Sequence, residues 1–136
     1  MPEDPFLVEC DRLSQLVNPT QYEQLRWSRE DGPMLARLVS LAFEALEDRP
    51  EIEMTEEGAT KDVKRYILKV HSNRIAAISI YLEAGLAMFR IDPIERSRYV
   101  ISSASPVSIA FEDANEQWVA DTLQELFSRI GDGAAG

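Results

Sequence analysis

The hydrophobic positions in the first third of the chain recur with the period of an α-helix. Four apolar residues spaced by four, three and four positions predict an amphipathic, partly buried helix: Phe6, Cys10, Leu13 and Val17. A longer stripe at 34–46 predicts a core helix that ends near Arg49-Pro50. Three helices are expected to begin at prolines that follow cap-favouring residues: Pro5, Pro19 and Pro33.

The hydrophobic period changes to two in the middle of the chain. The acidic stretch 50–62 has no apolar periodicity and is interpreted as a solvated loop, with room for a short extended piece at 52–54. Five later segments are rich in β-branched and aromatic residues and are predicted as strands: 63–70, 74–83, 86–92, 97–103 and 107–111. Their connections are too short for crossover helices, so an antiparallel meander is expected.

The strand register follows from the turns. A two-residue loop at Ala84-Gly85 creates one apolar face through three cross-strand pairs: Leu82 with Ala87, Ile80 with Phe89, and Ile78 with Ile91. The preceding strand joins this face only if its turn contains three residues, His71, Ser72 and Asn73. His71 is therefore interpreted as a loop residue.

The chain ends in a second strongly amphipathic helix. Asp113 and Glu116 resemble a capping box, and a stripe from Trp118 to Ile130 predicts a helix over 113–130. We therefore expect an α+β fold with two or three N-terminal helices, a five-stranded antiparallel sheet and a C-terminal helix packed on it. The expected organisation is one domain, 1–131, with a helical segment 1–49, an acidic loop 50–62, a sheet 63–111 and a disordered tail 132–136.

The charge is uneven along the chain. Residues 1–60 carry 14 acids and 5 bases, 61–111 carry 4 and 8, and 112–136 carry 6 and 1, which gives the net −10. This acidity disfavours nucleic acid and anionic lipid, which bind through Lys and Arg, and favours a protein partner. The charged start MPEDPF does not resemble a secretory signal, and no uncharged run approaches the length of a membrane span, so a cytoplasmic location is expected.

Few residues are candidates for chemistry. His71 is the only histidine, and a general-base role is weighed against a solvated turn residue, which we favour because no orienting carboxylate lies nearby in sequence. Cys10 is expected to be a buried neutral thiol. The acids around EIEMTEE lack the spacing of a calcium loop, and the six glycines form no nucleotide-binding motif, so no metal and no cofactor are predicted.

The second face of the predicted sheet is more apolar than a solvated face needs to be. A cover is expected there: helices of the same chain, a second copy or a client protein. The predicted partner-binding residues are Ile67, Ile75, Tyr81, Leu86, Met88, Arg90, Arg98 and Val100. The leading hypothesis is a non-enzymatic interaction protein such as a chaperone, adaptor or inhibitor, expected to be a homodimer.

Two alternatives remain open. One is a small-molecule binder or simple enzyme with a pocket between sheet and helices, in which His71, Glu83 and Arg90 are the catalytic candidates. The other is a nucleic-acid binder, which the flanking acids oppose. The element order resembles the outline of small acidic bacterial secretion chaperones, but the segment PIER is too short for the middle helix of that family. No family is assigned.

Overall fold

The computed structural model describes residues 4–60 and 62–133. Its contacts divide the chain into two compact units, Met1–Met34 and Leu35–Gly136. The first unit is helical, and the second contains the sheet and the helices that cover it.

The first unit is a pair of helices, α1 (Pro5–Val17) and α2 (Pro19–Arg26). Their starts are as predicted: the side chain of Asp4 accepts a hydrogen bond from the Phe6 N–H, and the side chain of Asn18 accepts one from the Gln21 N–H. Each cap satisfies a backbone donor that the first helical turn leaves open.

The helix after α2 does not begin at a new cap. A π-helical turn, η1 (Trp27–Asp31), runs directly into α3 (Gly32–Ala45), and the Gly32 N–H donates to the carbonyl of Trp27. Pro33 has no N–H, and its ring clashes with the carbonyl four residues earlier in a regular helix. The wider turn accommodates this proline, so the predicted separate start at Pro33 is wrong.

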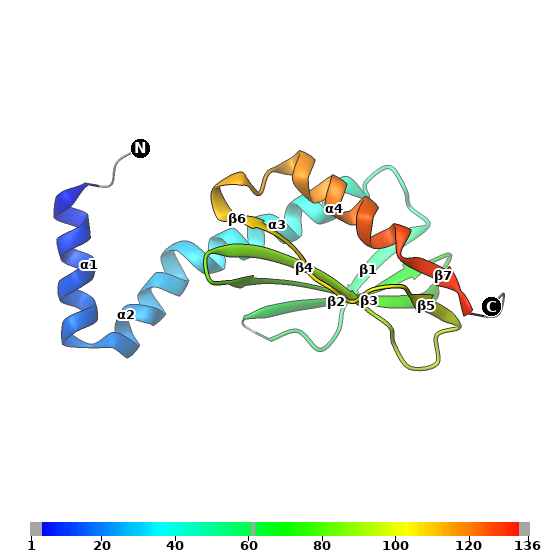
Figure 1. The fold of residues 1–136 in the computed structure, drawn as a ribbon, viewed down its shortest axis with the longest axis horizontal. Coiled ribbons are helices and arrows are strands. Elements are labelled where there is room, and N and C mark those ends of the chain that lie inside the picture. The colour runs from blue at the N-terminus through cyan, green and yellow to red at the C-terminus, as the bar shows by residue number, and fades with distance from the viewer. Residues whose placement is uncertain (1–3, 61, 134–136) are drawn as a thin grey trace. The chain divides into compact units, whose positions relative to one another are not determined.

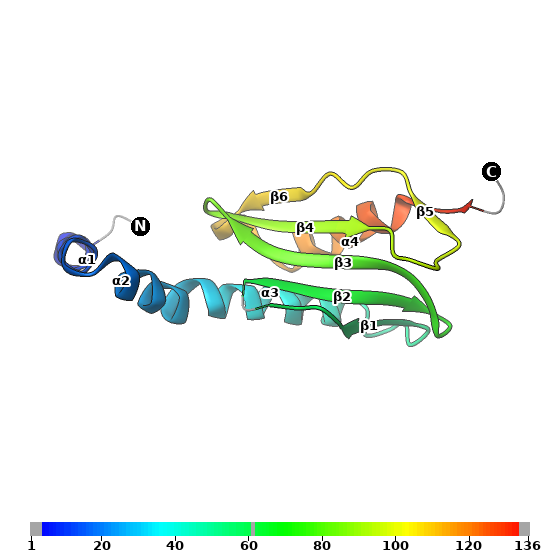
Figure 2. The same ribbon diagram turned by 90° about the horizontal axis from the view of Figure 1, so that it is seen from below.

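The second unit contains a five-stranded antiparallel sheet, which confirms the predicted α+β class. Its strands are β1 (Ile52–Glu56), β2 (Val63–Val70), β3 (Asn73–Glu83), β4 (Leu86–Asp92) and β6 (Val107–Ala110), in the order β1-β2-β3-β4-β6. Helices α3 and α4 (Glu116–Ser128) lie on the same face of this sheet (Figure 1). Figure 2, seen from below, shows the strands in front of both helices.

The hydrophobic core lies between this sheet face and the two helices. The predicted pairs Ile78 with Ile91 and Ile80 with Phe89 are confirmed, and all four side chains are fully buried. Two edge-to-face ring contacts join the layers: Phe43 of α3 with Tyr66, and Phe89 with Trp118 of α4. The helices contribute their own buried stripes: Leu35, Leu38 and Ala42 from α3, and Val119, Leu123 and Leu126 from α4.

Two strand assignments differ from the sequence prediction. The stretch predicted as a loop contains β1, which pairs with β2 through Met54 opposite Leu68. The segment predicted as the fourth strand contributes β5 (Tyr99–Ile101), which leaves the sheet and pairs with β7 (Ile130–Asp132). The C-terminal helix is therefore followed by a short strand, β7. The last residue of this strand, Asp132, is the first residue of the predicted tail.

The start of the C-terminal helix also differs. Phe111–Asp113 form a short 3-10 turn, η2, and the side chain of Asn115 accepts the capping hydrogen bond from the Trp118 N–H. The predicted capping role of Asp113 is therefore wrong. Residues 134–136 of the predicted tail lie outside the described residues.

The turn between β2 and β3 has two residues, not three. His71 and Ser72 have φ of 49° and 66°, and Val70 pairs with Asn73. A register shift between Leu68 and Lys69 offsets the missing loop residue, because an extra residue on β3 restores the facing of Tyr66 opposite Ile78. The predicted apolar face is thus correct, but a bulge produces it.

Replacing Ser72 with glycine is expected to stabilise the chain by about 1 kcal/mol, because a left-handed backbone costs a residue with a Cβ roughly that amount. For a unit of this size the thermal midpoint should rise by about 4–8 °C. Differential scanning calorimetry measures the shift. The matched control, Ser79→Gly in the extended part of β3, should lower stability by about 0.5–1 kcal/mol, and an equal effect at both sites would contradict the prediction.

Candidate functional site

The second face of the sheet, which the helices leave uncovered, has little exposed apolar bulk. Ile67 is 0% exposed and Met88 7% exposed, and Tyr81 and Leu86 are half-buried. Val100 is 53% exposed but belongs to the β5–β7 ribbon. The predicted partner-binding residues of this face are therefore mostly packed within the chain.

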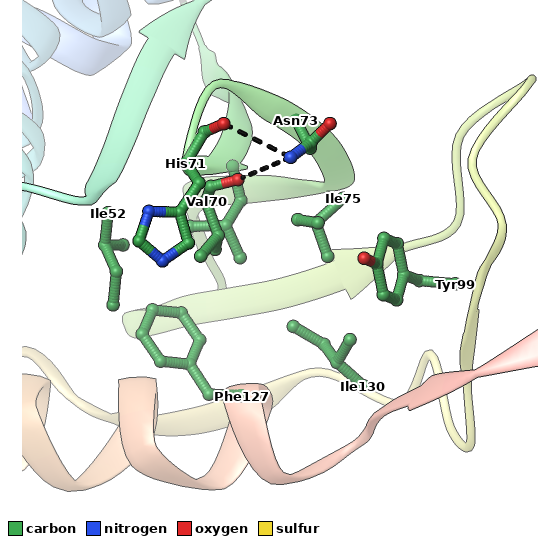
Figure 3. Close-up of a pocket in the computed structure, with 9 residues that line it drawn as sticks. Ile52, Val70, His71, Asn73, Ile75, Tyr99, Phe127 and Ile130 are labelled. Carbon is green, nitrogen blue, oxygen red and sulfur yellow. Dashed lines mark hydrogen bonds between the residues drawn. The ribbon is translucent and has the colours of Figure 1, made fainter.

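Ile75 lies with the helix-facing residues. The bulge beside it turns its side chain into a pocket that also contains Phe127 of α4 (Figure 3). The two arginines among the predicted partner-binding residues are ion-paired: Arg90 with Asp92 and Arg98 with Asp132, each at 2.9 Å. Arg90 lies in β4 of the main sheet, whereas Arg98 directly precedes β5 of the ribbon, so the two arginines belong to different sheets.

The three catalytic candidates do not converge. His71 lies in the turn before β3 and Glu83 is the last residue of β3, whose 11 residues span roughly 35 Å at about 3.3 Å each. Arg90 pairs with Ser79 in the middle of the strands and holds Asp92. His71 is therefore separated from both of the charged residues with which it was grouped.

Exposed apolar side chains are concentrated instead in α1. Of the nine large hydrophobic residues that are exposed among those described, six belong to this helix: Phe6, Leu7, Val8, Leu13, Leu16 and Val17. Cys10 lies on the same helix and is exposed, so its predicted burial is wrong. The helix has no buried residue at all.

One hollow of the second unit is a pocket of about 360 Å³ at one end of the sheet. Its walls come from the helix-facing side of β1 to β3, the end of α4 and the β5–β7 ribbon (Figure 3). The lining is mostly aliphatic and aromatic: Ile52, Leu68, Val70, Ile75, Phe127 and Ile130. The volume is within the range of small-molecule sites.

Three polar side chains complete this pocket: His71, Asn73 and Tyr99. The Asn73 amide donates to the carbonyls of Val70 and His71, at 3.3 and 3.2 Å, which fixes it across the turn. The backbone N–H of His71 donates to the carbonyl of Glu51 at 2.9 Å. The two-residue turn thus holds the imidazole against an apolar wall, with the Tyr99 hydroxyl on the other side (Figure 3).

A second, polar hollow of about 420 Å³ shares Asn73 and Tyr99 with this pocket. Its other lining residues are Ser72, Arg74, Arg96 and Arg98. Arg74 makes two hydrogen bonds to Glu57, at 2.9 and 3.1 Å, and these lower the pKa of the Glu57 carboxyl. The carboxylate is therefore ionised at neutral pH and balances Arg74.

Arg96 is the lining cation that no ion pair balances among the residues the structure describes. It has φ of 65° in the exposed connection between β4 and β5. Arg98 is held by Asp132 and lies over the Tyr99 ring, 5.3 Å from its centroid. We call the hollow that these three arginines line, Arg74, Arg96 and Arg98, the cationic hollow.

Other site classes find no support in the described part of the chain. Residues 4–60 and 62–133 contain no group of three or more His, Cys, Asp or Glu side chains placed to hold a metal ion. Within the same residues, no helix has the length and apolar character to cross a bilayer.

Sequence reasoning identified His71 and Ile75 but did not place them together. It missed Phe127, Ile130 and Tyr99, which reach the pocket from segments 25 to 60 positions away in the chain. The available signal in the sequence was a cluster of three arginines in or beside the segments HSN and PIERSR: Arg74, Arg96 and Arg98. Turn formation alone does not require these arginines. No family model matches this chain, and neither curated proteins nor solved structures give a significant match.

Proposed function

We propose that the chain is a protein-interaction module that binds a second copy of itself through α1. The observation that carries this proposal is the concentration of exposed large apolar residues on α1. Such residues are normally scattered over the surface of a monomeric protein, and a contiguous patch marks an interaction site. The sheet face first considered for this role is supported less, because Ile67 and Met88 are already buried.

The spacing of the α1 residues suits a helix partner. Phe6, Cys10, Leu13 and Val17 follow the alternating three- and four-residue steps of a coiled-coil seam, with Leu16 beside them. Fully burying a large apolar side chain contributes about 1.5–3 kcal/mol. Two such seams, one from each copy and each supported by its own α2, would bury enough apolar surface to offset the cost of association, which is of order 4–15 kcal/mol.

The charges of the first unit predict how this association responds to salt. Residues 4–34 carry six acids and three bases, a net −3, so two copies repel each other. On α1 itself, Glu9 and Arg12 form an intrahelical ion pair at 2.8 Å. Added sodium chloride screens the repulsion, so the dimer should become tighter as its concentration is raised.

Sedimentation velocity on the full chain, over a concentration series, tests this proposal. We expect a dimer in the wild-type chain and a monomer in Leu13→Asp, because a charge at the centre of the seam opposes burial. The matched control, Gln15→Asp, adds the same charge on the opposite side of α1 and should leave the dimer intact. A wild-type chain that stays monomeric at every concentration and salt, or equal effects of both variants, would refute the proposal.

A second candidate function is small-molecule binding. It is favoured by one observation, the 360 Å³ pocket that joins an apolar wall to His71, Asn73 and Tyr99. This candidate does not require α1 and is independent of dimer formation.

A further inference from the structure

We propose that the pocket and the cationic hollow together bind a small amphiphilic carboxylate, whose apolar body occupies the pocket and whose anionic group lies toward Arg96. This inference rests on the second candidate function and not on dimerisation through α1. The ligand class follows from two adjoining hollows of opposite chemistry that share Asn73 and Tyr99.

The apolar half of the site selects an aliphatic or aromatic body. Side chains from three separate elements form its wall: Ile52 of β1, Val70 of β2 and Phe127 of α4. Burying the apolar surface of a ligand there removes it from water, which favours binding roughly in proportion to the area covered. A volume of about 360 Å³ is near the lower end of small-molecule sites, so the body is small.

The polar half selects an anion. Arg74 and Arg98 are each held by a carboxylate, Glu57 and Asp132, which leaves Arg96 to provide the net positive charge of the lining. Glu95 lines a neighbouring hollow with Arg74 and Arg96. A guanidinium donates two parallel hydrogen bonds to the oxygens of a carboxylate, and this geometry suits a carboxylate better than a neutral alcohol.

The shared wall orients the ligand between the two halves. Tyr99 is half-buried and presents its hydroxyl toward the pocket, and the Arg98 guanidinium lies over its ring. A ligand that extends past Tyr99 therefore leaves the apolar pocket and enters the cationic hollow over the width of one side chain. The site therefore matches a short aliphatic or aromatic acid better than a fully polar or fully apolar molecule.

Two-dimensional ¹H–¹⁵N correlation spectra of the full chain, titrated with sodium octanoate, test this site. We expect saturable shifts at residues of the pocket and the cationic hollow, with a dissociation constant of about 1 mM or below. Octan-1-ol should bind about fivefold more weakly because it lacks the charge. Acetate should give no saturable shifts because it lacks the apolar body.

Two variants separate the halves of the site. Val70→Phe fills the pocket and should abolish octanoate binding, whereas Arg96→Ala should weaken octanoate about fivefold and leave octan-1-ol unchanged. Arg90→Ala, an exposed arginine elsewhere on the sheet, is the matched control and should have no effect. If Val70→Phe does not fold, the wild-type shift map and Arg96→Ala still decide the question.

Several results would overturn the proposal. Octanoate shifts confined to α1, the absence of saturable shifts, or equal effects of Arg96→Ala and Arg90→Ala would each do so. Binding to phosphatidylglycerol vesicles without any response to soluble octanoate would indicate a membrane surface and would equally overturn it. None of these results changes the sedimentation behaviour expected for α1, so the two proposals fail separately.

Discussion

Replacing Phe89 with alanine is expected to lower the free energy of unfolding of the sheet unit by about 3–5 kcal/mol. The side chain is 0% exposed and lies in the middle of β4, on the helix-facing side of the sheet. Its ring makes an edge-to-face contact with Trp118 of α4, with 5.3 Å between the centroids. The substitution therefore removes buried apolar surface, leaves a cavity and breaks the main aromatic contact between the sheet and α4.

This loss is large compared with the total stability of a domain, which is about 5–15 kcal/mol. Urea unfolding followed by circular dichroism measures it. Phe43→Ala is the matched control, because this phenylalanine also contacts the sheet, through Tyr66 at 5.5 Å, but is 42% exposed. We expect a loss of about 1 kcal/mol there. Equal losses at the two positions would show that the core is not centred on Phe89.

Ile67→Ala has the second-largest expected effect, a loss of about 2–5 kcal/mol. Ile67 faces away from α3 and α4, yet it is 0% exposed between Thr55 of β1 and Ala77 of β3. If this side chain were exposed to solvent, its substitution would lower the free energy of unfolding by less than about 0.5 kcal/mol. The measured value therefore distinguishes a sheet face packed within the chain from a free docking surface.

Two further substitutions calibrate this measurement in urea. Ile67→Val removes one methylene and should cost about 0.5–1.5 kcal/mol. Val100→Ala, at a position 53% exposed in the β5–β7 ribbon, should change stability by less than about 0.5 kcal/mol. If Ile67→Ala lowers the free energy of unfolding as little as Val100→Ala, then the uncovered sheet face is available to a partner, and the reason for preferring α1 as the binding surface is lost.

The stability of the sheet core also affects the ligand site. The pocket is bounded by strands whose positions depend on the core around Phe89, whereas none of its lining residues belongs to α1. Destabilising the core should therefore weaken octanoate binding together with stability, and disrupting the α1 seam should not. Measuring both properties in Leu13→Asp and Phe89→Ala separates the contributions of the two units.

The sequence alone determined the regular parts of this fold, because their signals are local. Continuous stripes define α3 and α4, and the Ala84-Gly85 turn fixes the pairing of Ile80 with Phe89. Proline after a capping residue marks the starts of α1 and α2. Each of these features depends on residues within a few positions of one another, so periodicity and turn chemistry are sufficient.

Features that depend on distant pairing were decided by the tertiary structure. The charged edge strand β1 resembles a loop in sequence because only two of its five residues are apolar, Ile52 and Met54, and charged residues are common on edge strands. The β5 strand pairs with β7, about 30 residues later, and no local pattern encodes that choice.

The candidate site was beyond sequence reasoning for the same physical reason. His71 was recognised as a turn residue, but the bulge that directs Ile75 toward Phe127 depends on the register between two strands, not on either strand alone. The exposure of Cys10 likewise follows from which surfaces α1 contacts, and a helical stripe does not specify its partner. Composition and period thus determined the three main strands and the helices, whereas long-range packing determined β1, the β5–β7 ribbon and the surfaces on which both functional proposals depend.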